Sequence, residues 1–541
     1  MEQYDLILLH APSVFDFRNR DDILFAYLSN SDAFSASQIY EIYPVGFRAI
    51  QTALQQQGKK VAIINLANMM LKNPEFDVAG FLRTLNARMF GIDLHWIVHT
   101  QGSLAVSKLL KELHPDVPIT FGGLSSSIFY HELLNEYPQV DFVVRGHETS
   151  NAINSVLNKL GSNSYGDIPN LCWKDESGNI QINEFCPPDQ YNEYVNWNFA
   201  DTNTTYYMVL PGAGCEYTCT FCGGSNYTMS KYYGMKEGFA AKPLNIFLKE
   251  LQTIKDAPAK NKRVVTLHHW FENIETLKQV LDTLNGGYIR TIHYTILNLI
   301  SEDHIKLLSE YPMRPLFEIS IESSSKDVRR ACGKPPYTNQ ELEAWLDMAF
   351  RYNKRAIVEI SLMIGLPEQT PVSVTQDLEY ASHLLGKYSE YDLNVYICPM
   401  RPFLDLCSVI HDNPEKFGFT ILFNRLRDYE KAMLVPHWKD SLNYETKWIS
   451  REQFVDITYK TCRGLTLVKQ QVHKLPKALA NTVVEKIDTT VKLLDTIKQY
   501  EKQPLPEHVR KEILAYNNEM LKSTASQQSP VNYSTYKNWY E

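Results

Sequence analysis

Three cysteines spaced C-x3-C-x2-C constrain this chain of 541 residues more than any other feature. Cys215, Cys219 and Cys222 follow the short apolar run 207–210, which predicts a strand that feeds a loop. A loop with this spacing can supply three thiolates to a cubane iron–sulfur cluster and leave the fourth iron without a protein ligand. An iron that is open to a small molecule implies chemistry as well as electron transfer.

Two other readings of the cysteines remain open. A structural zinc site normally needs four protein ligands, and no second C-x2-C pair stands elsewhere in the chain. A disulfide framework needs an oxidising compartment, and the N-terminus does not resemble a signal peptide. The other six of the nine cysteines are scattered, which is the usage of a reducing cytoplasm. We therefore expect a cytoplasmic protein whose three clustered cysteines are metal ligands.

Strand-like and helix-like runs alternate around the cysteines, and they predict an α/β fold. We expect a partial (β/α)6 barrel over residues 206–400, because six such units follow one another. Its strands are expected at 207–210, 263–267, 290–297, 316–323, 356–364 and 393–397. The cysteines then lie at the carboxyl end of the first strand, where barrel enzymes place their active sites.

The flanking regions differ from this barrel in character. Residues 1–150 alternate strands and helices in the pattern of a doubly wound, Rossmann-like parallel sheet, with glycines just past the strand ends. Residues 151–205 are expected to form a linker with a small hairpin. Residues 401–541 are expected to be α-helical and to close the open side of the barrel. The expected helices are 417–427, 451–471 and 482–501, followed by a polar segment at 523–529 that is expected to be disordered.

The cysteine loop resembles that of the radical S-adenosylmethionine (radical SAM) enzymes. Phe221 stands before the last cysteine and Gly223-Gly224 follow it. The run from Glu318 to Glu322 with Gly333-Lys334 downstream, and the run Met363-Ile-Gly-Leu-Pro367 with Thr370 downstream, match the fourth and fifth strands of that family in order and spacing. The resemblance implies that the methionine amino and carboxylate groups of the nucleotide bind the open iron.

The same resemblance implies which residues contact S-adenosylmethionine. Strand alternation puts Glu318, Ser320 and Glu322 on one face, where they would face the ribose and the methionine carboxylate. Gly365 would let the backbone approach the adenine. Each position also has a structural reading, since a glutamate on a strand is usually paired with a lysine or an arginine. Phe221, Gly223 and Gly224 complete the expected contacts of this cofactor.

The first 150 residues resemble the cobalamin-binding domain that precedes many radical SAM cores. The resemblance rests on Pro44-x-Gly46, on a Gly-Gly pair after a strand, and on the run 144–148 after the next strand. It implies that cobalamin contacts Gly102, Gly122, Gly123 and Gly146. Domains that ligate cobalt from below carry D-x-H-x-x-G, but the run that begins at Asp93 lacks the glycine. We therefore expect no protein imidazole on cobalt, although His95 and His99 remain candidates, as does a domain that has lost its ligand.

Composition limits the partners. A net charge of −8 argues against broad nucleic-acid binding, and no apolar run is long enough to span a bilayer. The expected partners are a small-molecule or peptide substrate and an electron donor of the flavodoxin or ferredoxin type. Another departure from the radical SAM pattern is His268-His269 after the second barrel strand, where relatives often carry acidic residues. These two histidines are the candidate catalytic residues, because they could contact substrate or exchange protons.

These features together predict a cobalamin-dependent radical SAM enzyme. The expected reaction is methylation of an unactivated carbon with a 4Fe–4S cluster, S-adenosylmethionine and cobalamin. One alternative is an oxidoreductase or cyclase that forms or rearranges a ring without methyl transfer. A second alternative, from another class, is a non-catalytic corrinoid-binding or redox-sensing iron–sulfur protein.

Overall fold

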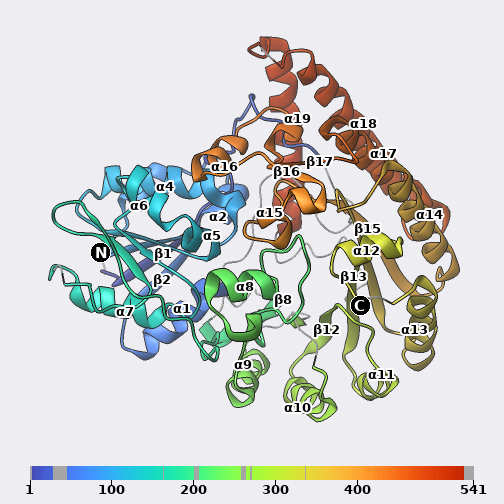
Figure 1. Cartoon of the computed structure of the whole chain (residues 1–541), viewed down its shortest axis with the longest axis horizontal. Coiled ribbons are helices and arrows are strands. Elements are labelled where there is room, and N and C mark those ends of the chain that lie inside the picture. The colour runs from blue at the N-terminus through green and yellow to red at the C-terminus, as the bar shows by residue number, and fades with distance from the viewer. Residues whose placement is uncertain are drawn as a thin grey trace.

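The computed structural model describes residues 3–27, 45–162, 164–199, 206–257, 263–267, 271–335, 337–501 and 503–528. Two sheets organise the chain, one in the N-terminal third and one in the middle, and long C-terminal helices lie across both (Figure 1). Within these described ranges, no helix is long and apolar enough to cross a membrane.

The N-terminal sheet has five parallel strands in the order β2-β1-β3-β4-β5. The strands are β1 Leu6–His10, β2 Val61–Asn65, β3 Phe90–Asp93, β4 Ile119–Gly122 and β5 Phe142–Val144. Helices α1 Val45–Gln56 and α7 Ser150–Lys159 pack on one face, and α2 Leu66–Lys72, α3 Val78–Arg83, α4 Thr100–Leu113 and α6 Tyr130–Glu136 pack on the other. Because both faces are covered, the strands are continuous apolar runs, as β1 illustrates with five buried residues in succession.

The hairpin expected within the linker extends this first sheet. Strands β6 Leu171–Lys174 and β7 Ile180–Ile182 add to β5 in antiparallel fashion, and Val144 pairs with Leu171. Asp175 closes the hairpin, because its carboxylate accepts hydrogen bonds from the backbone N–H groups of Ser177 and Asn179. Residues 151–205 therefore hold helix α7 and two strands of the first sheet as well as a connecting segment.

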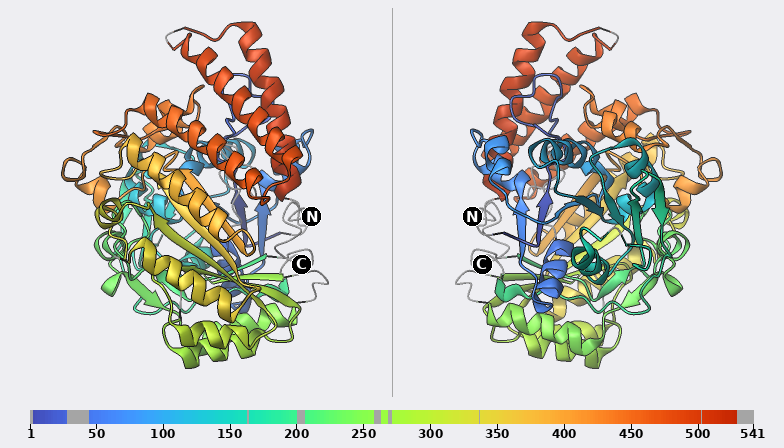
Figure 2. Two further views of the ribbon diagram at one scale, coloured as in Figure 1. Left: turned by 90° about the vertical axis from the view of Figure 1, so that its right-hand side faces the viewer. Right: turned by 90° about the vertical axis from the view of Figure 1, so that its left-hand side faces the viewer.

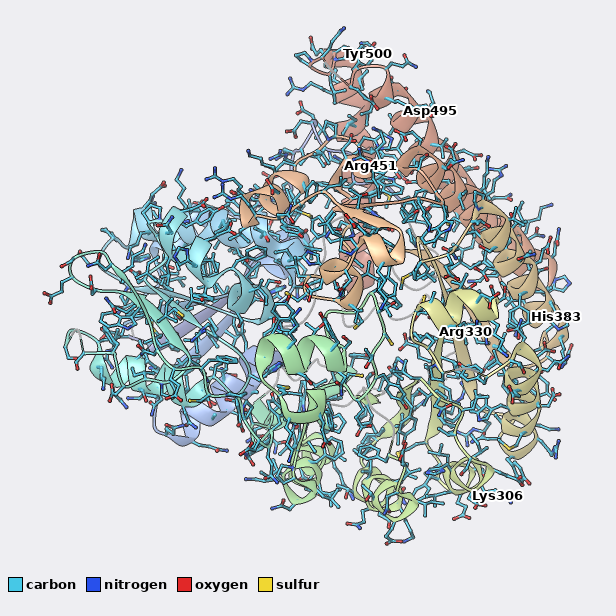
Figure 3. The ribbon with its side chains drawn as sticks, in the orientation of Figure 1. Lys306, Arg330, His383, Arg451, Asp495 and Tyr500 are labelled. Carbon is cyan, nitrogen blue, oxygen red and sulfur yellow. The ribbon has the colours of Figure 1, made fainter. Side chains whose placement is uncertain are left out.

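The second sheet has six parallel strands and confirms the expected partial barrel. In spatial order they are β8 Tyr206–Val209, β11 Arg263–Leu267, β12 Ile289–Ile296, β13 Arg314–Glu322, β14 Ile357–Ile364 and β15 Asp392–Pro399. Helices α9 Leu244–Asp256, α10 Ile274–Leu284, α11 Glu302–Ser309, α13 Asn339–Tyr352 and α14 Pro371–Lys387 form the outer layer (Figure 1). Apolar residues such as Ile319 and Ile360 are buried among these helices, so their strand neighbours face the inside of the barrel. Charged side chains such as Lys306 and His383 lie on the outer helices (Figure 3).

Three long helices make up most of the C-terminal region, which contacts both sheet domains (Figure 2). Helix α17 Arg451–Gln471 packs against α14 and β15, and α18 Lys477–Lys498 packs on α17. The start of α17 at the expected residue follows from a capping box between Ser450 and Gln453. Helix α19 Glu507–Gln528 returns to pack against α2 of the N-terminal domain.

Two expectations for this region are wrong. In place of a helix over 417–427, β16 Phe419–Ile421 pairs with β17 Tyr444–Thr446, and the short helix α16 Leu426–Ala432 follows. The chain reverses at Gly418, which has a φ of 68°, and Phe419 is then buried against Tyr444. Residues 523–528, which their polar composition predicts to be disordered, belong to α19.

One buried side chain on α19 holds the N-terminal segment. The side chain of Asn517 accepts a hydrogen bond from the backbone N–H of Phe25 at 2.8 Å and donates to the carbonyls of Arg20 and Ile23. We expect Asn517→Ala to destabilise the folded chain by about 2 kcal/mol, because it leaves buried backbone groups without partners. Urea-induced unfolding measures this loss. Asn518→Ala, which changes the exposed neighbour, should be neutral, and equal effects of the two changes would contradict this role.

Candidate cofactor site

The cysteine loop is fixed by backbone contacts at the carboxyl end of the second sheet. It runs from β9 Gly212–Gly214 to α8 Asn226–Tyr233, and β9 pairs with β10 Phe239–Ala241. The backbone N–H of Cys215 donates to the carbonyl of Gly238 at 3.0 Å. Gly214 has a φ of 87°, and a Cβ at this position would lie 2.1 Å from the Gly238 carbonyl oxygen. The close approach therefore requires a glycine at 214.

The three thiols are free, and those of Cys215 and Cys222 accept hydrogen bonds from the loop. Cys219 is buried, while Cys215 and Cys222 are half-buried. The backbone N–H of Tyr217 lies 3.4 Å from the Cys215 sulfur, and that of Gly224 lies 3.3 Å from the Cys222 sulfur. Such N–H donors stabilise a thiolate or a sulfur that is bound to metal. The expected cofactor residue Gly224 thus acts here through its backbone.

The thiols are protonated at neutral pH when no metal is bound. Burial raises the pKa of all three, and that of Cys222 rises to about 12. Metal binding must therefore displace these protons. In the part of the chain that the structure describes, no three His, Cys, Asp or Glu side chains converge on a single metal ion. Three closely spaced thiolates are a donor set that fits separate irons of one cluster.

The loop is tied to the turn after α12 Lys326–Ala331, the short helix that follows β13. Thr220 donates hydrogen bonds from its backbone to the carbonyl of Cys332 at 2.9 Å and from its hydroxyl to that of Ala331 at 3.0 Å. Gly333 packs so tightly on the loop that a Cβ there would lie 2.4 Å from the Thr218 carbonyl oxygen. This turn presents Lys334 to the cysteines.

Lys334 forms a buried ion pair with Glu322. The ammonium lies 2.8 Å from the carboxylate, and both side chains are about 5% exposed. Burial alone would lower the pKa of Lys334, but the charges of Glu322 and of the nearby cysteine sulfurs raise it. The ammonium also lies 5.9 Å from the ring centroid of Phe221. The structure therefore brings Glu322 and Phe221, two of the expected cofactor residues, together beside the cysteine loop.

The other expected residues of β13 have different partners. Glu318 contacts the Nε2 of His293 at 3.2 Å and accepts a hydrogen bond from the hydroxyl of Thr295. The ladder with β14 is irregular between Ser320 and Glu322, and Glu322 has a φ of 66°. As a result Glu318 and Ser320 remain half-buried on the inner face, whereas Glu322 is buried against Lys334.

Gly365, after β14, packs against the C-terminal region. A Cβ at this position would lie 2.7 Å from the hydroxyl of Tyr444 and from the ring of Phe454. Its backbone N–H donates to the side-chain carbonyl of Gln369 at 2.7 Å. The candidate catalytic residues His268 and His269 lie outside the described residues.

Glycines at the carboxyl edge of the first sheet also mark close approaches. A Cβ on Gly123 would lie 2.5 Å from the Cα of His95, and one on Gly102 would lie 1.7 Å from the Pro12 carbonyl oxygen. Gly146 has a φ of 84° and donates its N–H to the hydroxyl of Ser127 at 2.8 Å. Gly122 ends β4 at the same edge, so these glycines allow tightly packed turns there.

The histidines near this edge fall into two kinds. His99 is buried, its Nδ1 lies 3.1 Å from the Ala11 carbonyl oxygen, and burial lowers its pKa to about 4. Asp93 is engaged by His10 at 2.8 Å, so it does not orient His95 in the way that a D-x-H-x-x-G aspartate would. His95 itself is exposed, yet burial lowers its pKa.

Helix α8 joins the cysteine loop to the edge of the first sheet. The hydroxyl of Tyr233, near the end of α8, donates to the carbonyl of Leu124 at 2.8 Å. The Tyr233 ring lies 5.8 Å from the ring of His147, on the loop after β5. Burial and the nearby charge of His95 both lower the pKa of His147. The carboxyl edges of the two sheets therefore meet around α8, as expected for two cofactors that share one space.

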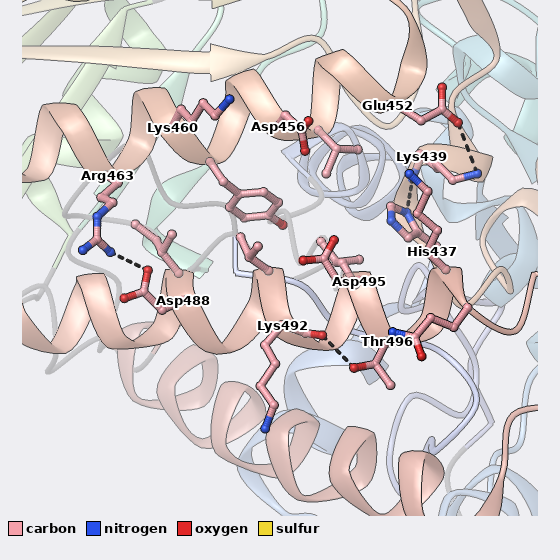
Figure 4. Close-up of a pocket in the computed structure, with 17 residues that line it drawn as sticks. His437, Lys439, Glu452, Asp456, Lys460, Arg463, Asp488, Lys492, Asp495 and Thr496 are labelled. Atoms are coloured by element: carbon pink, nitrogen blue, oxygen red, sulfur yellow. Dashed lines mark hydrogen bonds and ion pairs between the residues drawn. The ribbon is translucent and has the colours of Figure 1, made fainter.

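A separate cavity lies among the C-terminal helices. It measures about 570 Å³ and is lined by α17, α18 and the turn around His437 (Figure 4). Charged side chains such as Lys460, Asp488 and Asp495 surround an apolar floor that includes Tyr459. No strand of either sheet contributes to its lining, so this cavity is distinct from the cysteine loop.

Comparison with known families agrees with this geometry. Residues 35–153 match the model of the B12 binding domain, and residues 209–381 match that of the radical SAM superfamily. The chain belongs to the radical SAM proteins that carry a B12-binding domain. These matches confirm the cofactors that the sequence predicts, namely cobalamin, S-adenosylmethionine and an iron–sulfur cluster.

Solved structures support the fold of this radical SAM protein. The cobalamin-dependent S-adenosylmethionine radical enzyme OxsB, solved with aqua-cobalamin bound, is 13% identical and superposes with a TM-score of 0.55. The superposition covers 99% of this chain and 79% of OxsB. At this identity, the likeness concerns the fold alone.

Relatives of this radical SAM protein carry two kinds of name. An uncharacterized methyltransferase, PH0819 of Pyrococcus horikoshii, is 22% identical over 385 residues, which cover 66% of this chain and 80% of the relative. The anaerobic magnesium-protoporphyrin IX monomethyl ester cyclase of Synechocystis sp. is 24% identical over 125 residues, or 21% of this chain. The chain spans only about a quarter of the length of that cyclase, 24%.

Sequence reasoning missed two charged residues of this site. Asp405 accepts a hydrogen bond from the backbone N–H of Gly223 at 2.9 Å, and burial raises its pKa. It lies far along the chain from the cysteines and in no motif, so no local signal marks it. Lys334 stands in a family motif, but its pairing with Glu322 depends on the turn after α12 and could not be read from spacing.

We expect Cys219→Ala to abolish the visible absorption of the reconstituted cluster and all turnover, because it removes the buried ligand of a three-thiolate set. Anaerobic iron and sulfide analysis with a visible spectrum measures the result. Cys186→Ala is the matched control, since Cys186 is an exposed thiol remote from the loop in sequence. Full cluster content in the Cys219 variant would contradict the ligand assignment.

Proposed function

We propose that this radical SAM protein methylates an unactivated carbon of a small molecule or a peptide, in a cobalamin-dependent reaction. The observation that carries the proposal is the contact of α8 with both carboxyl edges, through Tyr233 and Leu124. This contact gives a substrate access to both edges at once. When bound, the cluster and S-adenosylmethionine supply a carbon-centred radical, and cobalamin supplies a transferable methyl group.

The second sheet is proposed to hold the cluster and the nucleotide. Cys215, Cys219 and Cys222 bind three irons, and the methionine end of S-adenosylmethionine binds the fourth. Glu318 and Ser320 face the inside of the barrel, where they hydrogen-bond polar groups of the nucleotide. Phe221, Gly223, Gly224, Glu322 and Gly365 shape the surrounding wall, and they do so partly through the contacts with Lys334, Asp405 and Gln369.

The first sheet is proposed to bind cobalamin at its carboxyl edge. Gly102, Gly122, Gly123 and Gly146 let the backbone of the edge turn tightly, which leaves room for the corrin. No imidazole of this chain is proposed to bind the cobalt from below, because His99 is bonded to the Ala11 carbonyl and Asp93 is engaged by His10.

The substrate and the electron donor complete the proposal. His268 and His269 come directly after β11 in the sequence, and we propose that they contact the substrate or exchange protons with it. The electron that reduces the cluster comes from a donor of the flavodoxin or ferredoxin type. A cytoplasmic setting suits a chain whose cysteines are all free among the residues described.

A ring-forming or rearranging reaction is the second candidate function. Matches to two cyclases favour it, one over 21% and the other over 58% of this chain. Both candidate functions need the same two cofactors at the same two sheet edges. They differ in whether the methyl group of S-adenosylmethionine appears in the product.

Product analysis separates these functions. With reduced, cluster- and cobalamin-loaded protein, we expect both 5′-deoxyadenosine and S-adenosylhomocysteine to form, because a radical methylation consumes two molecules of S-adenosylmethionine. Mass spectrometry after incubation with methyl-labelled S-adenosylmethionine measures both. 5′-Deoxyadenosine alone would favour the ring-forming reaction. If no 5′-deoxyadenosine and no S-adenosylhomocysteine were formed, both candidate functions would be contradicted.

A further inference from the structure

Lys334 places a buried positive charge beside the cysteine loop. Its ammonium lies 5.9 Å from the ring centroid of Phe221, the residue that precedes Cys222. The aliphatic part of the side chain and the ammonium are about 95% removed from solvent, since only 5% is exposed. Water and salt therefore screen this charge poorly.

The geometry also prevents Lys334 from moving away from the loop. Its backbone N–H donates to the Arg329 carbonyl at 3.1 Å, and the preceding residues receive two hydrogen bonds from Thr220. Gly333 is in contact with the Thr218 carbonyl. The ammonium is held by Glu322 at 2.8 Å. A fixed, buried charge beside a cluster-binding loop is a means of controlling the cluster electronically.

We propose that Lys334 sets the reduction potential of the iron–sulfur cluster, with Glu322 as its opposing charge. This inference depends on the cluster that the proposed function requires, but not on the reaction that follows. The step concerned is the transfer of one electron from a low-potential donor to the oxidised cluster. No bond forms or breaks and no proton moves in this step.

The sign of the effect follows from charge. A 4Fe–4S cluster with three thiolates carries a net negative charge, and reduction adds one more negative charge. The positive Lys334 therefore stabilises the reduced cluster more than the oxidised one and raises its potential. Glu322 does the reverse. The two side chains form a matched pair, and neutralising each one in turn should shift the potential in opposite directions.

This role differs from two simpler ones. If Lys334 were only a structural ion-pair partner, its removal would reduce cluster content or stability without shifting the potential of the cluster that remains. If Lys334 only contacted the carboxylate of S-adenosylmethionine, its removal would weaken nucleotide binding and leave the potential of the nucleotide-free cluster unchanged. The potential measured without nucleotide therefore distinguishes the proposed role from both.

The test is a redox titration of the reconstituted full-length protein without S-adenosylmethionine, followed by electron paramagnetic resonance of the reduced cluster. We expect Lys334→Gln to shift the reduction equilibrium at least tenfold toward the oxidised cluster, which is about 59 mV for a one-electron couple. Glu322→Gln should shift it toward the reduced cluster. Lys334→Arg should keep the wild-type potential, because it keeps the charge. Arg330→Gln is the control for an exposed charge nearby and should change nothing.

The possible results distinguish a failure of this inference from a failure of the proposed function. Equal potentials for wild type, Lys334→Gln and Glu322→Gln would overturn the inference and leave the proposed function standing. If Lys334→Gln failed to retain iron, Glu322→Gln would carry the test, and an unshifted potential in that variant would overturn the inference. A wild-type protein that binds no cluster would overturn the proposed function and this inference together.

Discussion

The contact between α8 and the first sheet is the constraint on which the rest of this structure depends. Tyr233 comes from the helix that the cysteine loop starts, and Leu124 comes from the turn after β4, so one hydrogen bond of 2.8 Å links the two candidate cofactor sites. Parallel sheets bind ligands at their carboxyl edges. Because α8 contacts the first sheet and follows the cysteine loop, the two proposed cofactor sites both adjoin this helix.

The C-terminal region holds this arrangement in place. Helix α17 packs on β15 and α14 of the barrel, whereas α19 packs on α2 and binds the N-terminal segment through Asn517. Asp405, just after the last barrel strand, reaches back to Gly223 in the cysteine loop. Segments distant in sequence thus fix the loop and the spacing of the two domains, which suits an enzyme whose main task is to position cofactors and exclude water.

The sequence predicts the parts of this molecule that depend on local pattern. The alternation of apolar strand-like runs with helix-like runs located all six barrel strands, and the capping residue Ser450 located the start of α17, because neighbouring residues alone determine these features. The prediction failed where the chain makes non-local contacts. The hairpin β6–β7 joins the first sheet only because β5 offers a free edge, and the segment 417–427 becomes β16 because β17 pairs with it. Among the candidate site residues, the irregular ladder after Ser320 places Glu322 against Lys334, which alternation along β13 could not reveal.

The central claim is that the cluster and cobalamin occupy one space between the two carboxyl edges. Pulsed electron paramagnetic resonance of protein loaded with both cofactors, with the cluster reduced and the cobalamin in its cob(II) state, measures the distance between the two unpaired spins. The account predicts a strong dipolar coupling between them, lost in protein loaded with either cofactor alone. Two independent spectra with no coupling would place the cofactors apart and contradict the account.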